Sequence, residues 1–293
     1  MAVSTTTAAS LIPTQVAKVL VKPLEAASKV LAAGPVIYDT AAPLKLPKLG
    51  PPVTDPGLTA ENGLIPERDV TVSDVSLLPS TMDSVKVITR FSNELIRQSV
   101  LSLDSVLQLR LVTDVAAKLD SIFWSASGDG VDTPRGLWAY SGIQNVNSVG
   151  VITLDHLLQA EELAVAGNVN TENLKWVFNS ATFFKLRRIK TATSGSNEYV
   201  LNPDPTKRGA WTIFGYPVIW TDRIPEIAGS PNTYRGALVD FSQLAVARDL
   251  APSVTFLRER YAEYDQAAIR VVARYDAAPL NAAAVVSLNG ITK

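Results

Sequence analysis

Seven prolines between residues 43 and 79 constrain this chain more than any other feature of its sequence. Proline cannot continue a helix and cannot donate to a strand ladder, so this segment forms neither a helix nor a central strand. Apolar and polar residues nevertheless alternate along Leu44–Leu46 and Val70–Ser73, and Asp55-Pro56-Gly57 and Asn62-Gly63 are turn signals between these limbs. The pattern predicts a long, irregular hairpin over residues 43–78; the alternative is a disordered linker.

Periodicity elsewhere predicts a mixture of helices and strands. The longest helix is expected from Ser102 to about Ala126, with one apolar stripe made of Val106, Leu109, Val112, Val115, Ala116, Leu119 and Phe123. Shorter helices are expected over Pro13–Ala33, over Leu154–Ala166 with Thr153 or Asp155 as the cap, and over Ala181–Thr191. Strands are expected over Ser84–Phe91, Lys175–Phe178, Thr212–Thr221, Ser253–Tyr261, Ala267–Arg274 and Ala283–Leu288. This order indicates an α+β fold without alternating βαβ units.

Composition excludes several kinds of chemistry. The chain has no cysteine, so disulfides, thiolate metal sites and cysteine nucleophiles are impossible. Its single histidine, His156, excludes a site with several histidine ligands and would have to serve any serine triad, yet no Gly-x-Ser-x-Gly elbow accompanies it. The net charge of −1 and the absence of a basic tail argue against tight binding of nucleic acid. We predict no cofactor, no signal peptide and no membrane span.

Three charged motifs remain. Gly128-Asp129-Gly130 fails the spacing of both calcium and phosphate loops, so we interpret it as the turn that ends the long helix. Arg187 and Arg188 lie on a basic helix that is either a solvated face, an inter-subunit contact or a surface for DNA. The mixed-sign run from Arg258 to Asp265 suits salt bridges across strands or subunits, or a plain solvated edge.

The order of these segments resembles the tailed-phage major capsid family, which has the Hong Kong 97 fold. The resemblance covers residues from about 12 to 288, and each motif is weak alone but the order is specific. The motifs that carry it are Ile12-Pro13-Thr14-Gln15-Val16, the acidic stretch Ala60 to Glu67, Val87 to Ser99, Thr133-Pro134-Arg135-Gly136-Leu137, Trp176-Val177-Phe178-Asn179, Phe214-Gly215-Tyr216-Pro217-Val218, Gly236 to Ser242, and Arg270 to Asp276 followed by Pro279 to Ala283.

The resemblance implies a structural protein and not an enzyme. It implies four parts: an N-arm over 1–42, an extended loop over 43–78, a peripheral domain over 79–130 and 255–293 with a long spine helix, and an axial domain over 131–254. Copies of the chain would form hexamers and pentamers of an icosahedral shell around phage DNA. Scaffolding, portal and decoration proteins are further expected partners. The expected location is the virion, after assembly in the host cytoplasm.

The same resemblance suggests which residues lie between subunits. On the extended loop and the peripheral domain they are Lys45, Lys48, Glu61, Glu67, Arg68, Arg258, Glu259 and Arg260. Arg187 and Arg188 are the residues expected to face DNA. Some family members start with a long scaffolding segment, which we do not expect here because about a dozen residues precede the matching region. Some cross-link a loop lysine to an asparagine of a neighbour, which we do not predict because no partner for Lys45 or Lys48 is identified.

Three alternatives remain open. An encapsulin is a cellular compartment shell of the same fold that carries cargo enzyme in place of DNA, and the proline-rich loop argues against it. A carboxylate enzyme would need acidic residues converging at strand ends, which the sequence does not show. A tail or portal component would lack the long extended loop.

Overall fold

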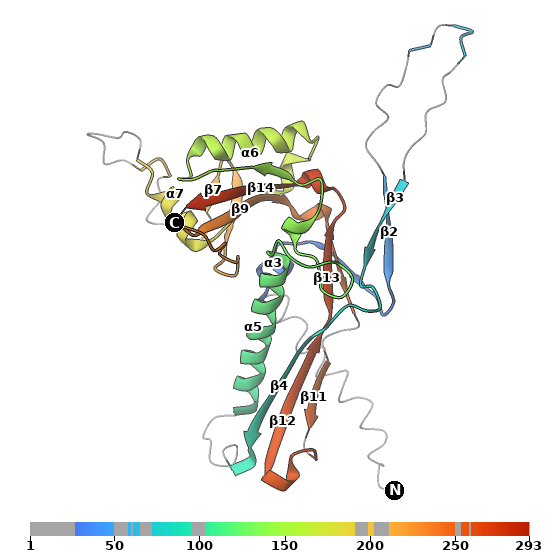
Figure 1. Ribbon diagram of the computed structural model, residues 1–293, viewed down its shortest axis with the longest axis vertical. Helices are drawn as coiled ribbons and strands as arrows, with labels where there is room; N and C mark the ends of the chain where they lie inside the picture. The colour runs from blue at the N-terminus through green and yellow to red at the C-terminus, as the bar shows by residue number, and fades with distance from the viewer. Residues whose placement is uncertain are drawn as a thin grey trace.

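The computed structural model has an elongated shape with three projecting parts (Figure 1). A limb formed by one long helix and long strands extends downward, a layered body of sheet and helices lies on the left, and a narrow hairpin projects on the upper right. The structure describes residues 27–49, 58–59, 61–64, 72–94, 103–190, 199–201, 211–249, 253–257 and 259–292.

The long helix is α5, Leu103–Phe123. Of its predicted stripe, Val112, Val115, Ala116, Leu119 and Phe123 are buried, together with Leu111. Leu109 is 65% exposed, so the expected stripe was wrong there. The side chain of Val106 lies outside the described residues.

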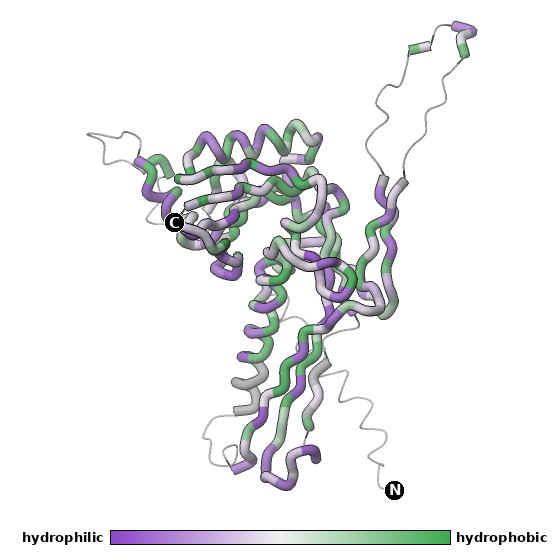
Figure 2. The backbone as a smooth tube through the Cα atoms, viewed as in Figure 1, coloured by the Kyte–Doolittle hydropathy of each residue, from purple (hydrophilic) through white to green (hydrophobic). Residues whose placement is uncertain are grey.

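Three long antiparallel strands lie alongside α5. Their order is β11 (Ser253–Leu257), β12 (Gln266–Ala273) and β4 (Val85–Ser92). Along β4, partly buried and exposed residues alternate, as the period of two in the sequence requires. Val85, Val87 and Phe91 pack toward the core that α5 completes, and Figure 2 shows the alternation of apolar and polar residues along this limb.

The body is built on a sheet of six strands. Their order is β5 (Gln144–Val146), β14 (Val285–Thr292), β9 (Thr233–Asp240), β6 (Leu174–Phe178), β8 (Tyr216–Trp220) and β7 (Thr212–Ile213). Two helices, α6 (Leu154–Ala166) and α7 (Ser180–Arg187), share one hydrophobic core on a single face of this sheet. The opposite face contributes Val177, Ala237 and Val239 to the core that contains α5.

A smaller sheet joins the body to the limb. Its order is β1 (Val36–Asp39), β10 (Leu244–Arg248) and β13 (Tyr275–Pro279), with β1 parallel to β10. Asp39 on β1 receives two hydrogen bonds from the Arg248 guanidinium, at 2.6 and 2.8 Å, across this parallel pair. A short helix, α3 (Lys29–Ala32), precedes β1, and the earlier part of the predicted N-terminal helix lies outside the described residues.

The predicted hairpin over residues 43–78 has paired limbs where it leaves the body. Strands β2 (Leu44–Leu49) and β3 (Val72–Leu77) are antiparallel, with Leu44 opposite Leu77 and Leu46 opposite Val75. Beyond them, Glu61 and Asn62 form a turn in which Asn62 has a φ of 61°, the left-handed conformation that Asn tolerates. Figure 1 places this turn far from the rest of the molecule.

Some boundaries differ from the sequence expectations. Helix α7 ends at Arg187, before the predicted end at Thr191, and the mixed-sign run after β11 is a turn with a 3-10 helix over Ala262–Tyr264 instead of a strand. Strand β14 pairs with β9 and β5, whereas the predicted division placed residues 255–293 with the limb. Its apolar residues Val286, Leu288 and Ile291 bury against α6, which fixes β14 in the body.

A buried carboxylate on α5 ties three segments together. Asp120 is fully buried and accepts hydrogen bonds from the Ser28 hydroxyl at 2.5 Å, the Lys29 backbone N–H at 2.9 Å and the Arg223 guanidinium at 2.6 Å. It thereby fixes the N-terminus of α3 and the loop that follows β8 to one turn of α5. Removing one partner of a buried charge that is paired in this way strongly destabilises the fold.

Replacing Asp120 with Ala should lower the free energy of unfolding of the unassembled subunit by about 3 kcal/mol, because the Arg223 guanidinium loses its carboxylate partner and the Ser28 hydroxyl and Lys29 N–H lose an acceptor. Urea denaturation measures this change. Asp114→Ala on the same helix is the matched control, because Asp114 is exposed and pairs with Arg110 at 3.1 Å. A surface pair of this kind contributes at most about 1 kcal/mol. Equal losses in the two variants would contradict the role given to Asp120.

Candidate assembly surfaces

The extended hairpin exposes charged and apolar side chains together. Lys45 pairs with Asp74 across the two strands at 3.6 Å, and both side chains are largely exposed. Lys48 lies on β2 opposite Ser73 and is half-buried. At the tip, Glu61 is exposed between two leucines, Leu58 and Leu64, that are fully exposed. Glu67 and Arg68 lie outside the described residues.

A small hydrophobic cluster holds the base of the hairpin. Leu77, Leu78 and Met82 are buried in it against alanines of β10 and β13, and Tyr140 packs at its edge. Leu78 has a φ of 52°, a conformation that bulky residues avoid and that costs about 1 to 3 kcal/mol unless its surroundings enforce it. Leu78 therefore holds a strained backbone conformation directly after β3 ends at Leu77.

Asp276 on β13 provides that enforcement. Its carboxylate is buried and accepts hydrogen bonds from the backbone N–H of Leu78 at 3.0 Å and of Ala277 at 2.9 Å. Burial raises the pKa of Asp276 to about 6, although these two hydrogen bonds and the nearby Arg135 and Arg274 act in the opposite direction. Sequence reasoning missed this residue, because nothing around an Asp-Ala-Ala run signals a buried carboxyl.

The predicted contact residues on the limb lie at its far end. Glu259 and Arg260 are exposed in the turn between β11 and β12, and Arg258 lies outside the described residues. The Tyr261 ring lies 5.8 Å from the Arg260 guanidinium and 5.4 Å from that of Arg90 on β4. This end of the limb therefore presents cations around one aromatic ring.

The two arginines expected to face DNA have different surroundings. The guanidinium of Arg187 stacks over the Trp211 ring, 4.0 Å from its centroid, and also lies near the rings of Phe183 and Phe184. Arg188 is exposed and ends α7. Arg187 therefore covers an aromatic cluster, a role that the sequence did not indicate, and Arg188 is the more accessible cation.

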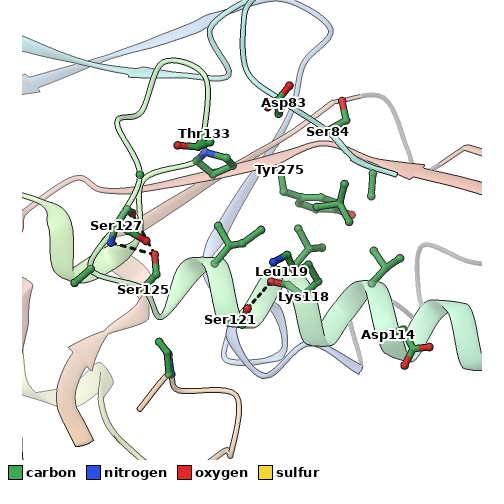
Figure 3. Close-up of a pocket in the computed structure, with 18 of the residues that line it drawn as sticks. Asp83, Ser84, Asp114, Lys118, Leu119, Ser121, Ser125, Ser127, Thr133 and Tyr275 are labelled. Atoms are coloured by element: carbon green, nitrogen blue, oxygen red, sulfur yellow. Dashed lines mark hydrogen bonds between the residues drawn. The ribbon is translucent and has the colours of Figure 1, made fainter. Parts of the chain in front are cut away.

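A cavity of about 1150 Å³ opens between α5 and the start of β4 (Figure 3). Its lining includes Leu119 and Lys118 on α5, Tyr275 on β13, and Asp83 just before β4. Ser125 and Ser127 line its rim, where α5 has ended. A catalytic site requires polar groups that converge on one point. The polar groups named here are instead dispersed around the opening.

The turn after α5 is a closed loop built on Asp129. Its carboxylate accepts hydrogen bonds from the backbone N–H groups of Val131, Asp132 and Thr133, which lowers the pKa of Asp129 to about 2. Gly128 has a φ of 102°, and a Cβ there would lie 2.2 Å from the Pro134 carbonyl oxygen. The motif is thus the helix-ending turn that the sequence predicted.

His156 has a structural role at the start of α6. Thr153 caps this helix, and the His156 ring reaches back to the Thr153 backbone N–H at 3.2 Å.

Across the described ranges, no group of three or more His, Asp or Glu side chains is arranged to hold a metal ion. Among the same residues, no helix is both long and apolar enough to cross a membrane.

Comparison with known proteins identifies relatives for this fold. The sequence profile of the phage capsid family matches residues 8–290. Among solved structures, the capsid of a native GTA particle is 18% identical with a TM-score of 0.69, and the match covers 90% of each chain. A structure from Mycobacterium phage Bobi is 18% identical with a TM-score of 0.67, covering 91% of each chain. No curated protein matches the sequence. The expected α+β capsid fold is confirmed by these likenesses.

The raised pKa of Asp276 predicts a particular pH dependence of stability. Its contribution is fully present below about pH 4, where the carboxyl is protonated in both states, and is lost as the pH rises through about 6. The free energy of unfolding is compared between the natural subunit and Asp276→Asn at each pH. From pH 4 to pH 7, the value for the natural subunit should fall by about 3 kcal/mol relative to that of the variant. Denaturant titrations at a series of pH values measure it.

Asp129→Asn is the control for this prediction. The pKa of Asp129 is lowered to about 2, so its contribution is present above its ordinary pKa and is lost as the pH falls through about 2. Asp129→Asn should therefore give a constant difference from the natural subunit between pH 4 and 7. If the difference in free energy of unfolding between Asp276→Asn and the natural subunit were also constant from pH 4 to 7, the raised pKa of Asp276 would be contradicted.

Proposed function

Because the chain belongs to the phage capsid family and is a major capsid protein of a virion shell, we propose that its copies associate into hexamers and pentamers that enclose double-stranded DNA. The extended hairpin is the observation that supports this proposal. It leaves the body at Leu44 and Leu77, and its tip, which Figure 1 places far from the body, exposes Leu58 and Leu64. Exposed leucines at such a position fit burial against another copy.

The four predicted parts remain our proposal for how the chain divides its tasks. The N-arm over 1–42 and the extended loop over 43–78 reach neighbouring subunits. The peripheral domain is proposed over 79–130 and 255–293 and the axial domain over 131–254, with the single change that β14 joins the axial domain, because β14 pairs with β9. In this arrangement the hairpin base, fixed by Asp276 and Leu78, sets the angle at which one subunit meets the next.

The role of the chain is structural, and we propose that it has no catalytic activity. The dispersed polar groups around the cavity beside α5 support this view. A substrate bound there against converging polar side chains would contradict it. Scaffolding, portal and decoration proteins are the proposed additional partners, and assembly in the host cytoplasm is the proposed route to the virion.

Contact with packaged DNA is proposed to be weak and without sequence preference. The net charge of −1 gives the subunit no overall attraction for a polyanion. Arg188 is exposed and remains a candidate contact, whereas the guanidinium of Arg187 is occupied by the Trp211 ring. A sub-micromolar, sequence-selective affinity of the free subunit at physiological salt would contradict this proposal.

Replacing residues 49–62 with a short Gly-Ser turn should leave a folded, soluble subunit that does not form shells. The base of the hairpin keeps its cluster around Leu77, so the body loses none of its core. An isolated two-stranded ribbon is marginally stable in water, so the removed part contributes little to folding of the free subunit. Thermal melting checks folding and electron microscopy checks assembly.

The matched control exchanges Lys45 and Asp74, reversing one salt bridge on the hairpin without shortening it. This exchange preserves the pair and should permit assembly. Normal shells from the shortened variant, or a melting temperature far below that of the natural subunit, would contradict the proposed role of the hairpin.

A further inference from the structure

The chain contains two Asn-Gly sequences, and the structure places them in opposite surroundings. Asn62-Gly63 lies in the turn at the tip of the extended hairpin, and Asn289-Gly290 lies inside β14. An asparagine loses its side-chain amide most easily when glycine follows it, because glycine has no Cβ to hinder its own backbone nitrogen. The turn signal at the tip therefore also marks a place where the chain can change covalently.

The reaction needs only the chain and water. The backbone nitrogen of the glycine attacks the side-chain carbonyl carbon of the asparagine, and a succinimide ring closes through the new C–N bond. The side-chain nitrogen leaves as ammonia and takes the proton that the glycine nitrogen gives up. Water then opens the ring at one carbonyl or the other, giving aspartate or isoaspartate. The attack is intramolecular, so it proceeds without a catalyst wherever the two groups can approach.

The amide of Asn289 is held by hydrogen bonds at both of its polar atoms. Its Nδ2 donates to the side-chain oxygens of Asn145 at 3.0 Å and Asn147 at 3.1 Å. Its Oδ1 accepts from the Arg235 Nε–H at 3.1 Å and from the Ser287 hydroxyl at 2.9 Å. Attack by the following nitrogen would have to break these bonds first, so this site is protected in the folded chain.

The site at the hairpin tip lacks this protection. Asn62 and Gly63 are both exposed, and Figure 1 places the turn far from the body. Among the residues that the structure describes, none forms a hydrogen bond with the Asn62 side chain. A two-stranded ribbon is only marginally stable alone, so rotation of the Asn62 backbone toward the geometry of attack costs little in a free subunit.

Conversion would change the tip in charge and in backbone length. It places a second carboxylate directly after Glu61, in a turn whose neighbours Leu58 and Leu64 are suited to burial. Burying an unpaired charge is costly. Isoaspartate also lengthens the backbone by a methylene group at a position whose φ is 61°, so the chain no longer forms the turn that Asn62 forms.

We propose that Asn62-Gly63 is a self-modification site: in the free subunit Asn62 converts to aspartate and isoaspartate, and converted subunits are lost from assembly. The inference rests on the proposed shell function and adds to it a covalent change that distinguishes new subunits from old ones. The second Asn-Gly sequence, at Asn289, is the internal control that the chain itself provides.

The chemistry is tested on the unassembled fraction of the natural protein, separated by sedimentation and incubated at mildly alkaline pH. Peptide mass mapping and labelling by an isoaspartyl methyltransferase follow each site with time. Conversion at Asn62 should be at least about tenfold faster than at Asn289, because the bonds around Asn289 must break first. In urea the two sites should convert at similar rates. Equal rates in the folded subunit, or a folded Asn62 that stays unchanged while the unfolded chain converts, would overturn the proposal.

The effect on assembly is tested with two variants that block the reaction. Asn62→Gln would have to close a larger ring, and Gly63→Ala places a Cβ beside the attacking nitrogen. After incubation, the natural protein should yield at least about threefold less protein in shells than before, corresponding to about 0.65 kcal/mol. Both variants should keep the yield that they had when fresh.

A second readout compares the two fractions of one assembly reaction of the aged natural protein. Isoaspartate at residue 62 should be at least about threefold more abundant in unassembled subunits than in shells. Equal abundance in the two fractions, or an equal loss of yield by the aged variants, would overturn the loss of converted subunits from assembly. Fresh natural protein that forms no shells would instead overturn the proposed function itself.

Discussion

A two-stranded ribbon buries too little apolar surface to be stable alone, and this constraint governs the whole molecule. The hairpin formed by β2 and β3 is such a ribbon, anchored at its base by the cluster around Leu77 and Leu78. Past that cluster, the described tip residues Leu58 and Leu64 are fully exposed. The hairpin is therefore the part of the chain whose apolar residues its own body does not cover, and this is why we propose that a second copy covers them.

The body supports this hairpin through buried polar anchors. Asp276 holds the strained backbone of Leu78 where β3 ends, and Asp120 ties α3 and the loop after β8 to α5. Both carboxylates lie inside apolar surroundings, where a satisfied hydrogen bond fixes geometry strongly and an unsatisfied one is costly. The Asp276 anchor thereby fixes the backbone at the base of the hairpin.

Local periodicity was sufficient to predict much of the fold. Helix α6 spans Leu154–Ala166 as expected with Thr153 as its cap, and the hairpin limbs pair within the predicted segment. Strands β10 and β13 were not predicted, because their alanine-rich stretches are buried on both faces and lack alternation. The parallel pairing of β1 with β10 joins residues about 200 positions apart, which no local pattern encodes.

The functional surfaces were predicted less completely, for a related reason. Charge in a sequence shows where cations occur but not what they contact: Arg187 covers Trp211, while Lys86, Arg90 and Arg270 meet on one face because β4 and β12 happen to pair in this register. Asp276 and Asp120 were overlooked, since burial of a carboxylate depends on tertiary packing. The overall function was accessible because the order of the motifs resembles that of a known family, whereas each contact depends on pairing between distant segments.

Electron microscopy of shells assembled from the purified natural protein tests the central claim most directly. The account predicts closed icosahedral particles in which every hairpin from Leu44 to Leu77 lies on an adjacent subunit. Particles in which the hairpin folds back onto its own body, or a protein that remains monomeric under all assembly conditions, would contradict it.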